Sequence, residues 1–513
     1  MLLDSKNVGQ TAIALLALGS PTAATSLSTV EYSTGTPPCD AIIQAGLGHR
    51  LLFATDPQYE PRIESYWALN PRRRPYCLAQ PHTPQEVSTI MTALLEVESA
   101  GDWSIAVRAG GHNIGHTNNI DTGVTIDLEY LNQTTYSIDT NVASVSPGSH
   151  WQDVYAELHK HGVVVTGGRD GDVGVGGFLL GGGSTYYMAQ TGFGCDSIVN
   201  YEVVLINGSI INANSTANSD LWRALKGGGS NFGIVTRYDM EALDDKKLAH
   251  GTRTIAGNHT AQFLSAVVDF TNSQQKYNND ALVPYLLHAE GEDFLETIEV
   301  NLDGDTASPG FEKFRQIPSI TPFTQNVEPL SVAAANSTVS GSSWYVSGGT
   351  LTFRNDEKIL NYAAKVHKEY AQAVDNAIGK KSYVSTIFLQ PLPSFFAEIS
   401  EEKGGNMFAG TMKGQNSVLW TATSLVYTNQ SDLAVVESHM REMTAKLKSY
   451  SVSVDGDNDL IYLNYADSLQ DPLGSYPKEN VEHMKQVAAK YDPEGKFQTR
   501  FPGGFKISRV DDA

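Results

Sequence analysis

The sequence predicts an α+β fold, with two α/β subdomains in the first half of the chain and an antiparallel sheet backed by helices in the second. Its 513 residues exceed the length at which one hydrophobic core usually stops growing, so more than one lobe is expected. Short apolar strands alternate with helices among Gly-rich turns up to residue 235. From about residue 251 glycine becomes sparse and longer alternating segments appear.

The first half of the chain begins with a helix expected from Asp40. Thr83 as N-cap, Pro84 at the first helical position and Glu86 at the third form a capping box, which predicts a helix to about residue 98. Another helix is expected at 151–161. The predicted strands of this half are 76–80, 104–108, 124–128, 143–145 and 163–165.

The second half of the chain carries longer elements. Strands are predicted at 382–389 and 417–427, and amphipathic helices at 357–377 and 432–448. The last 50 residues change texture again. A strand is predicted at 460–465 and a helix at 480–491, which Asp492-Pro493 ends.

Charge and the N-terminal residues indicate a secreted chain. The net charge of −21 repels phosphate backbones, so nucleic acid is not expected as a partner. Residues 1–24 resemble a signal peptide, with Lys6 before an apolar run at 11–18 and small residues at 22–24. No later apolar stretch is long enough for a membrane span. Six glycosylation sequons support export: Asn132, Asn207, Asn214, Asn258, Asn336 and Asn429.

The three cysteines predict one disulfide at most. Cys39 and Cys77 flank the N-terminal segment and could join it to the first strand in an oxidising compartment. Cys195 lies in an apolar, Gly-rich stretch and is expected to be a small buried side chain.

Several common catalytic signatures are missing from the sequence. It has neither a P-loop nor a GxSxG elbow, and the run at 174–179 lacks the last glycine of the dinucleotide fingerprint. His112 and His116 have HxxxH spacing without the glutamate of a zinc protease. The acidic run at 455–459 lacks the glycine and glutamate of a calcium loop. No metal site is therefore expected.

Three glycine-rich turns remain, and their order is informative. They lie at 108–113, directly after a predicted strand, at 174–183, and at 227–233. Backbone N–H groups of such turns can converge on phosphate oxygens, and the absence of side chains lets a large ligand approach closely. In this order and spacing the turns resemble the vanillyl-alcohol oxidase superfamily with its PCMH-type FAD-binding domain. The fungal FAD-linked oxidoreductases similar to berberine bridge enzyme are the branch that they resemble most.

The resemblance covers residues 75–244 and 462–497, somewhat less than half of the chain. After the expected signal peptide at 1–24, it implies an N-terminal segment at 25–72 and a PCMH-type FAD-binding domain at 73–246. A substrate-binding domain would follow at 247–458, and the C-terminal segment 459–513 would return to the FAD domain. Within the middle lobe no motif indicates the substrate.

The resemblance also implies how FAD is held. His112 occupies the position of the histidine that bonds covalently to the 8α-methyl carbon of the flavin. The surrounding loop, which holds the pyrophosphate in the family, contributes Arg108, Gly110, Gly111, Asn113 and Gly115. Further positions that resemble flavin contacts are Gly167, Gly168, Asp172, Gly176, Gly177, Gly183, Glu202, Val203, Asn231, Gly233 and Ile234.

Many relatives attach the flavin a second time, through a cysteine three residues before a VGVGG run. Here that run is residues 173–177 and the matching position is Asp170, which cannot form a thioether. Only single attachment is therefore expected. Because doubly linked members often oxidise oligosaccharides, a carbohydrate substrate becomes the less favoured alternative.

The run Tyr462-Leu463-Asn464-Tyr465 resembles the YxNY segment that lies over the flavin in the family. The resemblance makes Tyr465 the candidate general base, with Tyr462 beside it and Asn464 against the flavin. A phenol with a pKa near ~10 needs a cation or hydrogen bonds to act at neutral pH. On a strand the two tyrosines would point to opposite faces, so both reach one site only if the strand bends or ends there.

Three functions follow as hypotheses. The first is an FAD-dependent oxidase or dehydrogenase of a small-molecule alcohol, amine or polyketide-type intermediate in fungal secondary metabolism. It would pass hydride to flavin N5 and electrons to molecular oxygen, giving hydrogen peroxide. The second is a secreted oligosaccharide oxidase. The third is a binding protein of the same fold that lacks flavin or activity. The oligomeric state has no signal in the sequence.

Overall fold

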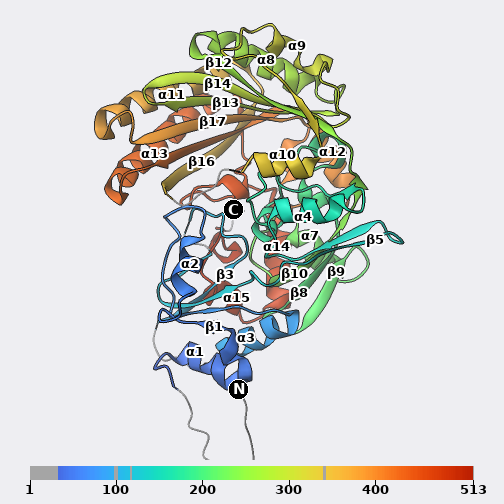
Figure 1. Cartoon of the computed structure of the whole chain (residues 1–513), viewed down its shortest axis with the longest axis vertical. Coiled ribbons are helices and arrows are strands. Elements are labelled where there is room, and N and C mark those ends of the chain that lie inside the picture. The colour runs from blue at the N-terminus through green and yellow to red at the C-terminus, as the bar shows by residue number, and fades with distance from the viewer. Residues whose placement is uncertain (1–32, 98–101, 116–117, 339–342, 512–513) are drawn as a thin grey trace, which may run out of the picture.

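The computed structural model describes residues 33–97, 102–115, 118–338 and 343–511. The expected signal peptide at 1–24 lies outside these residues. Two bodies are stacked along the long axis of the molecule, with the N-terminal elements in the lower one and the large sheet in the upper one (Figure 1). The predicted α+β class is confirmed.

The first sheet of the lower body has the strand order β1-β2-β4-β3, and β4 pairs with β2 and β3 in parallel. The strands predicted at 76–80, 104–108 and 124–128 are confirmed to within a residue at each end. Helices α1 (Pro37–Ile42) and α3 (Pro84–Glu96) share its core. The strands are β1 (Leu51–Leu52), β2 (Cys77–Ala79), β3 (Ser104–Arg108) and β4 (Gly123–Asp127).

Only half of the predicted capping box forms at the start of α3. The Thr83 hydroxyl accepts the N–H of Glu86 at 3.1 Å, as expected. The Glu86 carboxylate does not return to the Thr83 N–H. It accepts the guanidinium of Arg50 at 2.8 Å and the backbone N–H of His82 at 2.6 Å. A charged partner for this carboxylate thus replaces the reciprocal bond, and Arg50 is tied to the helix start.

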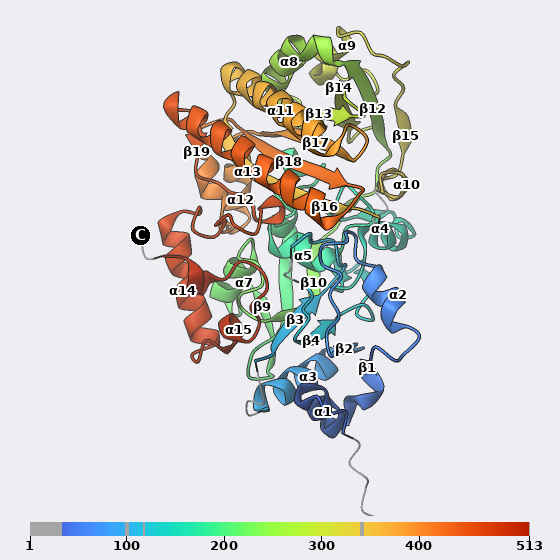
Figure 2. The same cartoon turned by 90° about the vertical axis from the view of Figure 1, so that its left-hand side faces the viewer.

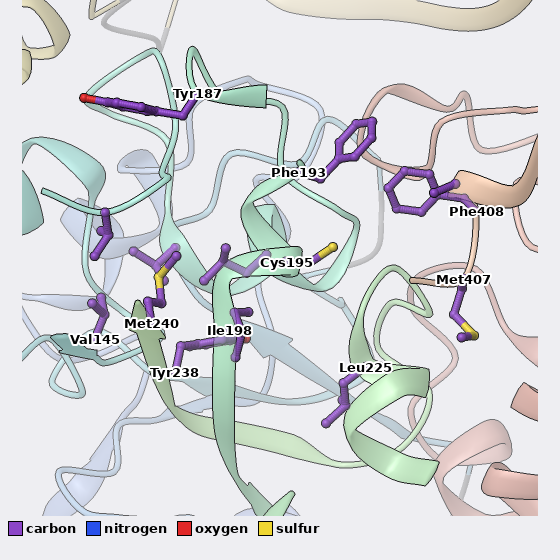
Figure 3. Close-up of a cluster of buried hydrophobic side chains, with 14 of the residues drawn as sticks. Val145, Tyr187, Phe193, Cys195, Ile198, Leu225, Tyr238, Met240, Met407 and Phe408 are labelled. Atoms are coloured by element: carbon purple, nitrogen blue, oxygen red, sulfur yellow. The ribbon is translucent and has the colours of Figure 1, made fainter. Parts of the chain in front are cut away.

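The second sheet is antiparallel, with the order β5-β6-β10-β8-β9. Its apolar face packs on helices of this body, and Phe193, Cys195, Ile198 and Phe408 belong to the shared core (Figure 3). The strands are β5 (Thr134–Ser137), β6 (Val142–Val145), β8 (Ile198–Val204), β9 (Ile210–Asn214) and β10 (Ile234–Glu241). The other elements are α4 (Trp151–His159), α5 (Val175–Leu180), α6 (Met188–Thr191), α7 (Ser219–Leu225), β7 (Val163–Val164) and β11 (Leu243–Asp244).

The upper body is built on an eight-stranded sheet with the order β15-β12-β14-β13-β17-β18-β16-β19, in which every pairing is antiparallel. Helices α8 (Thr260–Ser273), α11 (Glu357–Ile378) and α13 (Gln430–Ser453) lie side by side on one face (Figure 2). The strands are β12 (Leu248–Ala256), β13 (Asp280–Ala289), β14 (Glu292–Asn301), β15 (Asn326–Glu328), β16 (Tyr345–Arg354), β17 (Tyr383–Leu392), β18 (Ser417–Val426) and β19 (Asp457–Asn458). Shorter helices are α2 (Tyr59–Glu64) in the lower body, and α9 (Glu312–Arg315), α10 (Leu330–Asn336) and α12 (Phe395–Glu402) after β14.

The strand predicted at 460–465 is wrong. Residues 459–462 run without regular structure, and Leu463–Tyr465 form a single 3-10 turn. The turn begins after Tyr462, whose backbone is extended, so the chain bends between the two tyrosines. Helices α14 (Lys478–Tyr491) and α15 (Lys496–Thr499) then return to the lower body, where Phe497 and Phe501 enter the core of the first sheet.

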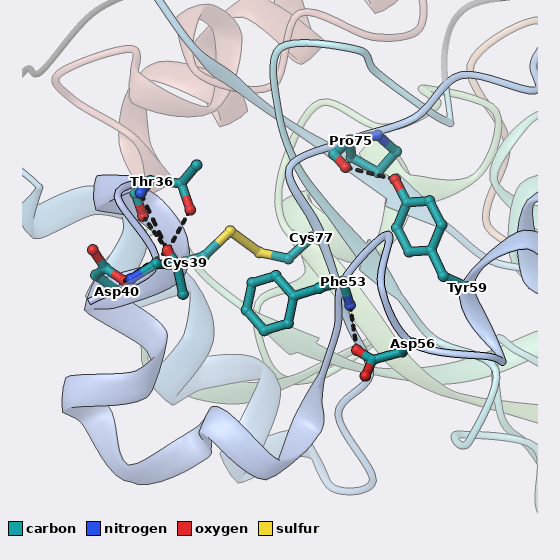
Figure 4. The surroundings of a disulfide bond; sticks show 9 residues. Thr36, Cys39, Asp40, Phe53, Asp56, Tyr59, Pro75 and Cys77 are labelled. Atoms are coloured by element: carbon teal, nitrogen blue, oxygen red, sulfur yellow. Dashed lines mark hydrogen bonds between the residues drawn. A yellow bond between two sulfur atoms is a disulfide. The ribbon is translucent and has the colours of Figure 1, made fainter. Parts of the chain in front are cut away.

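The predicted disulfide is present between Cys39 in α1 and Cys77 in β2 (Figure 4). Cys195 is a free, buried thiol, as expected. In the part of the chain that the structure describes, no helix combines the length and the apolar character needed to cross a bilayer.

Candidate active site

A cavity of about 490 Å³ lies between the two bodies. Its walls come from the loop after β3, the turns at 168–181 and 229–235, the C-terminal residues 463–466 and 497–505, and strands β16 and β18 of the large sheet. The three glycine-rich turns and the YxNY run therefore meet at one place.

His112 stands on the wall of this cavity. Its ring stacks on the indole of Trp67, with 4.4 Å between centroids and 23° between planes. The Nδ1 atom is buried and has no hydrogen-bond partner among the described residues. Burial lowers the pKa of His112 to about 4, so the imidazole is neutral near neutral pH. A neutral imidazole carries a free nitrogen lone pair, as a nucleophile or a ligand requires.

The glycines beside His112 let two loops cross without side chains. A Cβ atom on Gly110 would lie 2.4 Å from the Cα atom of Gly174, which is closer than any side chain permits. Gly111 has a φ of +76°, a conformation that favours glycine. Asn113 lines the cavity, and its side-chain oxygen accepts the N–H of Gly115 at 2.7 Å. Gly115 itself is not part of the wall.

Of the glycines predicted to contact FAD at 167–183, some line the cavity and others pack behind its wall. Gly168, Gly176 and Gly177 line the cavity, and a Cβ on Gly177 would point into open space. Gly167 packs against Trp151 outside the wall, and Gly183 against Phe178. Asp172 is also outside it.

Asp172 binds a neighbouring histidine. Its backbone oxygen lies 2.5 Å from Nδ1 of His150, and its carboxylate lies 3.4 Å from the same atom. The contact with the Asp172 side chain raises the pKa of His150, and the same contact lowers the pKa of Asp172. This pair fixes the loop that carries Gly174 against the His112 loop.

Arg108 also lies behind the cavity wall and does not contact the cavity itself. Its guanidinium carbon lies 3.7 Å from the centroid of the Tyr66 ring, and it donates hydrogen bonds to Arg62 O and Ser65 Oγ. It is 1% exposed and does not line the cavity.

The third turn contributes Gly233 and Ile234 to the wall. Val203 is a core residue of β8, and Glu202 pairs with Arg237 at 2.9 Å and accepts the hydroxyl of Thr236. Asn231 is fully buried. Its amide donates to Gly228 O and Phe505 O, and its oxygen accepts the N–H of Ile507, so it holds the C-terminal segment against the turn. Glu202, Val203 and Asn231 thus lie behind the wall.

Tyr465 and Asn464 line the cavity, and Tyr462 does not. The Tyr465 hydroxyl accepts a hydrogen bond from Arg169 at 3.0 Å, and the same nitrogen donates to Gln390 at 2.7 Å. Tyr462 is buried below, with its ring centroid 5.0 Å from that of Tyr465. Burial raises the pKa of Tyr462 well above its usual value, so it is a neutral hydroxyl. The 3-10 turn thus brings the two tyrosines together, although only Tyr465 reaches the site.

Two wall residues were missed by the sequence reasoning. Trp67 belongs to the N-terminal segment, which carries no motif. Arg169 lies between Gly168 and Gly171, just before the second glycine-rich turn, and a single cation among glycines was the available signal. Beyond these, the large sheet supplies Val346 and Gly348 from β16 and Thr421 and Thr423 from β18.

The residues of the wall fit an FAD molecule. Glycine-rich turns line the cavity, their side-chain-free positions leave room for a ligand, and the neutral His112 on its wall has a buried Nδ1 without a partner among the described residues. Within the described ranges, no group of three or more His, Cys, Asp or Glu side chains is placed to hold a metal ion.

Comparisons with known proteins agree with this fit. The profile of an FAD binding domain family matches residues 75–214. The chain is 33% identical over 479 residues to FAD-dependent monooxygenase drtC of Aspergillus calidoustus, a match that covers 92% of this chain and 90% of that protein. It is 32% identical over 477 residues to FAD-dependent monooxygenase sdcF of Emericella nidulans, covering 92% and 98%.

Solved structures show the same fold. Glucooligosaccharide oxidase of Acremonium strictum superimposes with a TM-score of 0.73 at 18% identity, and BBE-like 1 of Physcomitrella patens with a TM-score of 0.72 at 17% identity. Each match covers 92% of this chain and 99% of the other. The chain therefore belongs to the fungal FAD-linked oxidoreductases of the berberine-bridge-enzyme-like family.

Proposed function

We propose that the chain oxidises a small-molecule alcohol, amine or polyketide-type intermediate of fungal secondary metabolism. When bound in the cavity, FAD would supply the redox chemistry: it would accept a hydride at N5 and pass the two electrons to dioxygen, giving hydrogen peroxide. One observation carries the proposal: His112 and Tyr465 line the same cavity, and a guanidinium meets the Tyr465 hydroxyl there.

Tyr465 is proposed as the general base that takes the substrate's hydroxyl or amine proton. The charge-assisted hydrogen bond from Arg169 holds the Tyr465 hydroxyl at the cavity wall, and Gln390 fixes the guanidinium by accepting from the same nitrogen. Tyr462 supports the Tyr465 ring from below. Asn464 donates to Phe178 O at 3.0 Å and is thereby held at the cavity wall, where it would contact the flavin.

His112 is proposed to hold FAD covalently, through a bond between an imidazole nitrogen and the 8α carbon. Forming that bond removes one hydrogen from the imidazole and one from the methyl carbon, and dioxygen takes both with two electrons as hydrogen peroxide. The neutral state of His112 supports this role.

Other wall residues are proposed as non-covalent FAD contacts: Gly110, Gly111, Asn113, Gly168, Gly176, Gly177, Gly233 and Ile234. The proposed contacts behind the wall would act by shaping it: Arg108, Gly115, Gly167, Asp172, Gly183, Glu202, Val203 and Asn231.

Oligosaccharide oxidation is the alternative. It is favoured by the fold shared with glucooligosaccharide oxidase, which carries a 6-S-cysteinyl, 8α-N1-histidyl FAD. Asp170 lines the cavity here and offers no thiol for a second bond. Ile114, Val346 and Leu463 also line the cavity, and apolar side chains of this kind suit an apolar substrate better than a sugar.

The test is peroxide release by the purified, yellow protein against a panel of aromatic alcohols, amines, polyketides and oligosaccharides. Peroxide with the aromatic or polyketide members supports the proposal, and peroxide with the sugars alone supports the alternative. Because the relatives are named monooxygenases, the same reactions are run under ¹⁸O₂. Label in the product would overturn the oxidase assignment.

For the base, we expect Tyr465→Phe to slow flavin reduction in a single turnover by about 100-fold or more, the usual range of a general base. The yellow colour should remain, because the hydroxyl does not hold FAD. Tyr427→Phe, an exposed tyrosine of the same type, is the matched control. Unchanged reduction in Tyr465→Phe would remove Tyr465 from the role.

We also propose that the protein enters the secretory pathway. The disulfide between Cys39 and Cys77 supports this, because such bonds persist in oxidising compartments. Five of the six sequon asparagines are exposed, and Asn214 is half-buried with its amide bound to Asn200. Export into the medium of a fungal host would test the proposal, and retention of the full-length chain inside the cell would contradict it.

A further inference from the structure

We propose that Trp67 is the positioning residue that holds the His112 imidazole in the plane from which it bonds to FAD. This inference rests on the proposed attachment through His112. It adds a part of the N-terminal segment, which carries no cofactor motif, to the attachment machinery.

Apart from Trp67, few contacts with the described residues fix the orientation of the His112 ring. The residue lies in an irregular loop after β3, so a regular backbone does not set its side-chain direction. Its Nδ1 atom has no hydrogen-bond partner among the described residues. The stacked indole of Trp67, at 4.4 Å between centroids, is the ring contact that orients it.

Aromatic stacking on its face can orient the His112 imidazole and still leave its nitrogens free to act as a nucleophile. The lone pair of an imidazole nitrogen points outward in the plane of the ring, so a hydrogen bond to that nitrogen would occupy the electrons needed for bonding. A flat ring on the imidazole face fixes the plane and leaves the edge with its nitrogens free. Aromatic stacking therefore orients His112 without competing for the reacting atom.

Trp67 is itself held in place by hydrogen bonds of its own backbone and of the residues that follow it. Its backbone N–H donates to Gly111 O at 3.2 Å, next to His112. Two residues on, the N–H of Leu69 donates to Trp344 O, and the Asn70 side chain exchanges hydrogen bonds with the backbone N–H and C=O of Val346 in β16. The segment 66–70 thus connects the loop after β3, which carries Gly111 and His112, with the large sheet, and Trp67 lies between them.

The experiment compares Trp67→Phe with Trp67→Leu in the full chain, expressed and then supplied with FAD. Phenylalanine keeps a flat face for His112, and leucine keeps apolar volume without one. The readouts are total flavin by absorbance and covalent flavin, measured as yellow colour that stays with acid-precipitated protein over time. Trp222→Leu is the matched control, since it removes an equally half-buried indole from α7, away from the cavity.

We expect Trp67→Leu to attach FAD about 2- to 12-fold more slowly, the factor that the free energy of one aromatic stack corresponds to. Flavin should still bind and be released on denaturation, while Trp67→Phe and Trp222→Leu attach at nearly the wild-type rate. Attachment by Trp67→Leu at the wild-type rate would overturn the inference, and so would an equal loss in Trp67→Phe. Trp67→Met replaces the leucine variant if that protein does not fold.

His112→Ala separates this inference from the proposal on which it rests. If the wild type holds covalent flavin and His112→Ala does not, the attachment site stands and only the Trp67 variants decide the positioning role. Covalent flavin in His112→Ala, or none in the wild type, would overturn the attachment and the role of Trp67 together.

Discussion

At the scale of single residues, Arg169, just before the second glycine-rich turn, is the cation that contacts the proposed base Tyr465. Arg169 reaches its two partners, Tyr465 and Gln390, through one nitrogen. A hydrogen bond that involves a charged group is stronger than one between neutral groups, so this contact can hold the Tyr465 hydroxyl in place. The other titratable groups around this pair are Asp170, Tyr462 and Tyr186.

We therefore expect Arg169→Met to slow flavin reduction about 10- to 100-fold, the worth of one hydrogen bond to a charged group. Arg169→Lys should recover part of the loss, since a lysine supplies the charge without the planar geometry. The measurement is anaerobic stopped-flow reduction across the pH range. Arg237→Met, which breaks an ion pair with Glu202 away from the wall, is the control. An unchanged rate of flavin reduction in Arg169→Met would show that Arg169 does not act on Tyr465.

The residues of the site differ in how far the sequence predicts them. His112 and Tyr465 stand inside runs whose neighbours carry the signal, so their place on one wall could be anticipated. Trp67 and Arg169 make their contacts across 45 and 296 positions of sequence. Such contacts form only when distant parts of the chain fold together, and local patterns carry no record of that.

At the scale of elements, local rules predict what local energies decide. The helix α3 starts where Thr83 caps it and Pro84 opens it, and the strand Ser104–Arg108 has the predicted bounds. The stretch 460–465 is rich in aliphatic and aromatic residues, as strands are, and becomes a turn instead. Tyr462 packs among Phe193 and Phe408, and Asn464 is tied to Phe178 O, so tertiary contacts hold the chain in a bend.

The layer formed by α11 and β17 carries a prediction on pH. His367 in α11 is buried, its Nε2 lies 3.0 Å from the Ser385 hydroxyl of β17, and burial lowers its pKa from 6.5 to about 4. The unfolded chain therefore takes up a proton on this residue first as the pH falls. The free energy of unfolding should decrease between pH 6.5 and 4, by about 3 kcal/mol from this residue. The charged groups nearest to it are His288 and Asp293.

We expect His367→Gln to flatten this part of the stability profile, because glutamine can keep a hydrogen bond to Ser385 and does not titrate. Urea unfolding at several pH values measures the effect. The exposed His49→Gln is the control, and its profile should match that of the wild type. A variant profile as steep as the wild-type one would assign the acid sensitivity to other groups.

At the scale of the whole molecule, the cavity is assembled from parts of the chain that no single body contains. The loop after β3 and the glycine-rich turns belong to the proposed FAD domain at 73–246. Strands β16 and β18 belong to the proposed substrate domain at 247–458, and Tyr465 belongs to the C-terminal segment. A ligand that touches all three walls links them, and its binding energy adds to the stability of the closed arrangement.

His112→Ala makes this linkage measurable, because FAD should then bind reversibly. With FAD at 100 times its dissociation constant, the unfolding free energy should rise by about 2.7 kcal/mol. Hydrogen exchange should slow in two places at once, the loop after β3 and the inner part of β18 around Thr421 and Thr423, since both line the cavity. AMP serves as the comparison ligand: it carries only the adenylate half of FAD and should protect the glycine-rich turns without β18. Protection by FAD that stopped at the lower body would mean that the large sheet does not meet the flavin, and that the substrate approaches from another side.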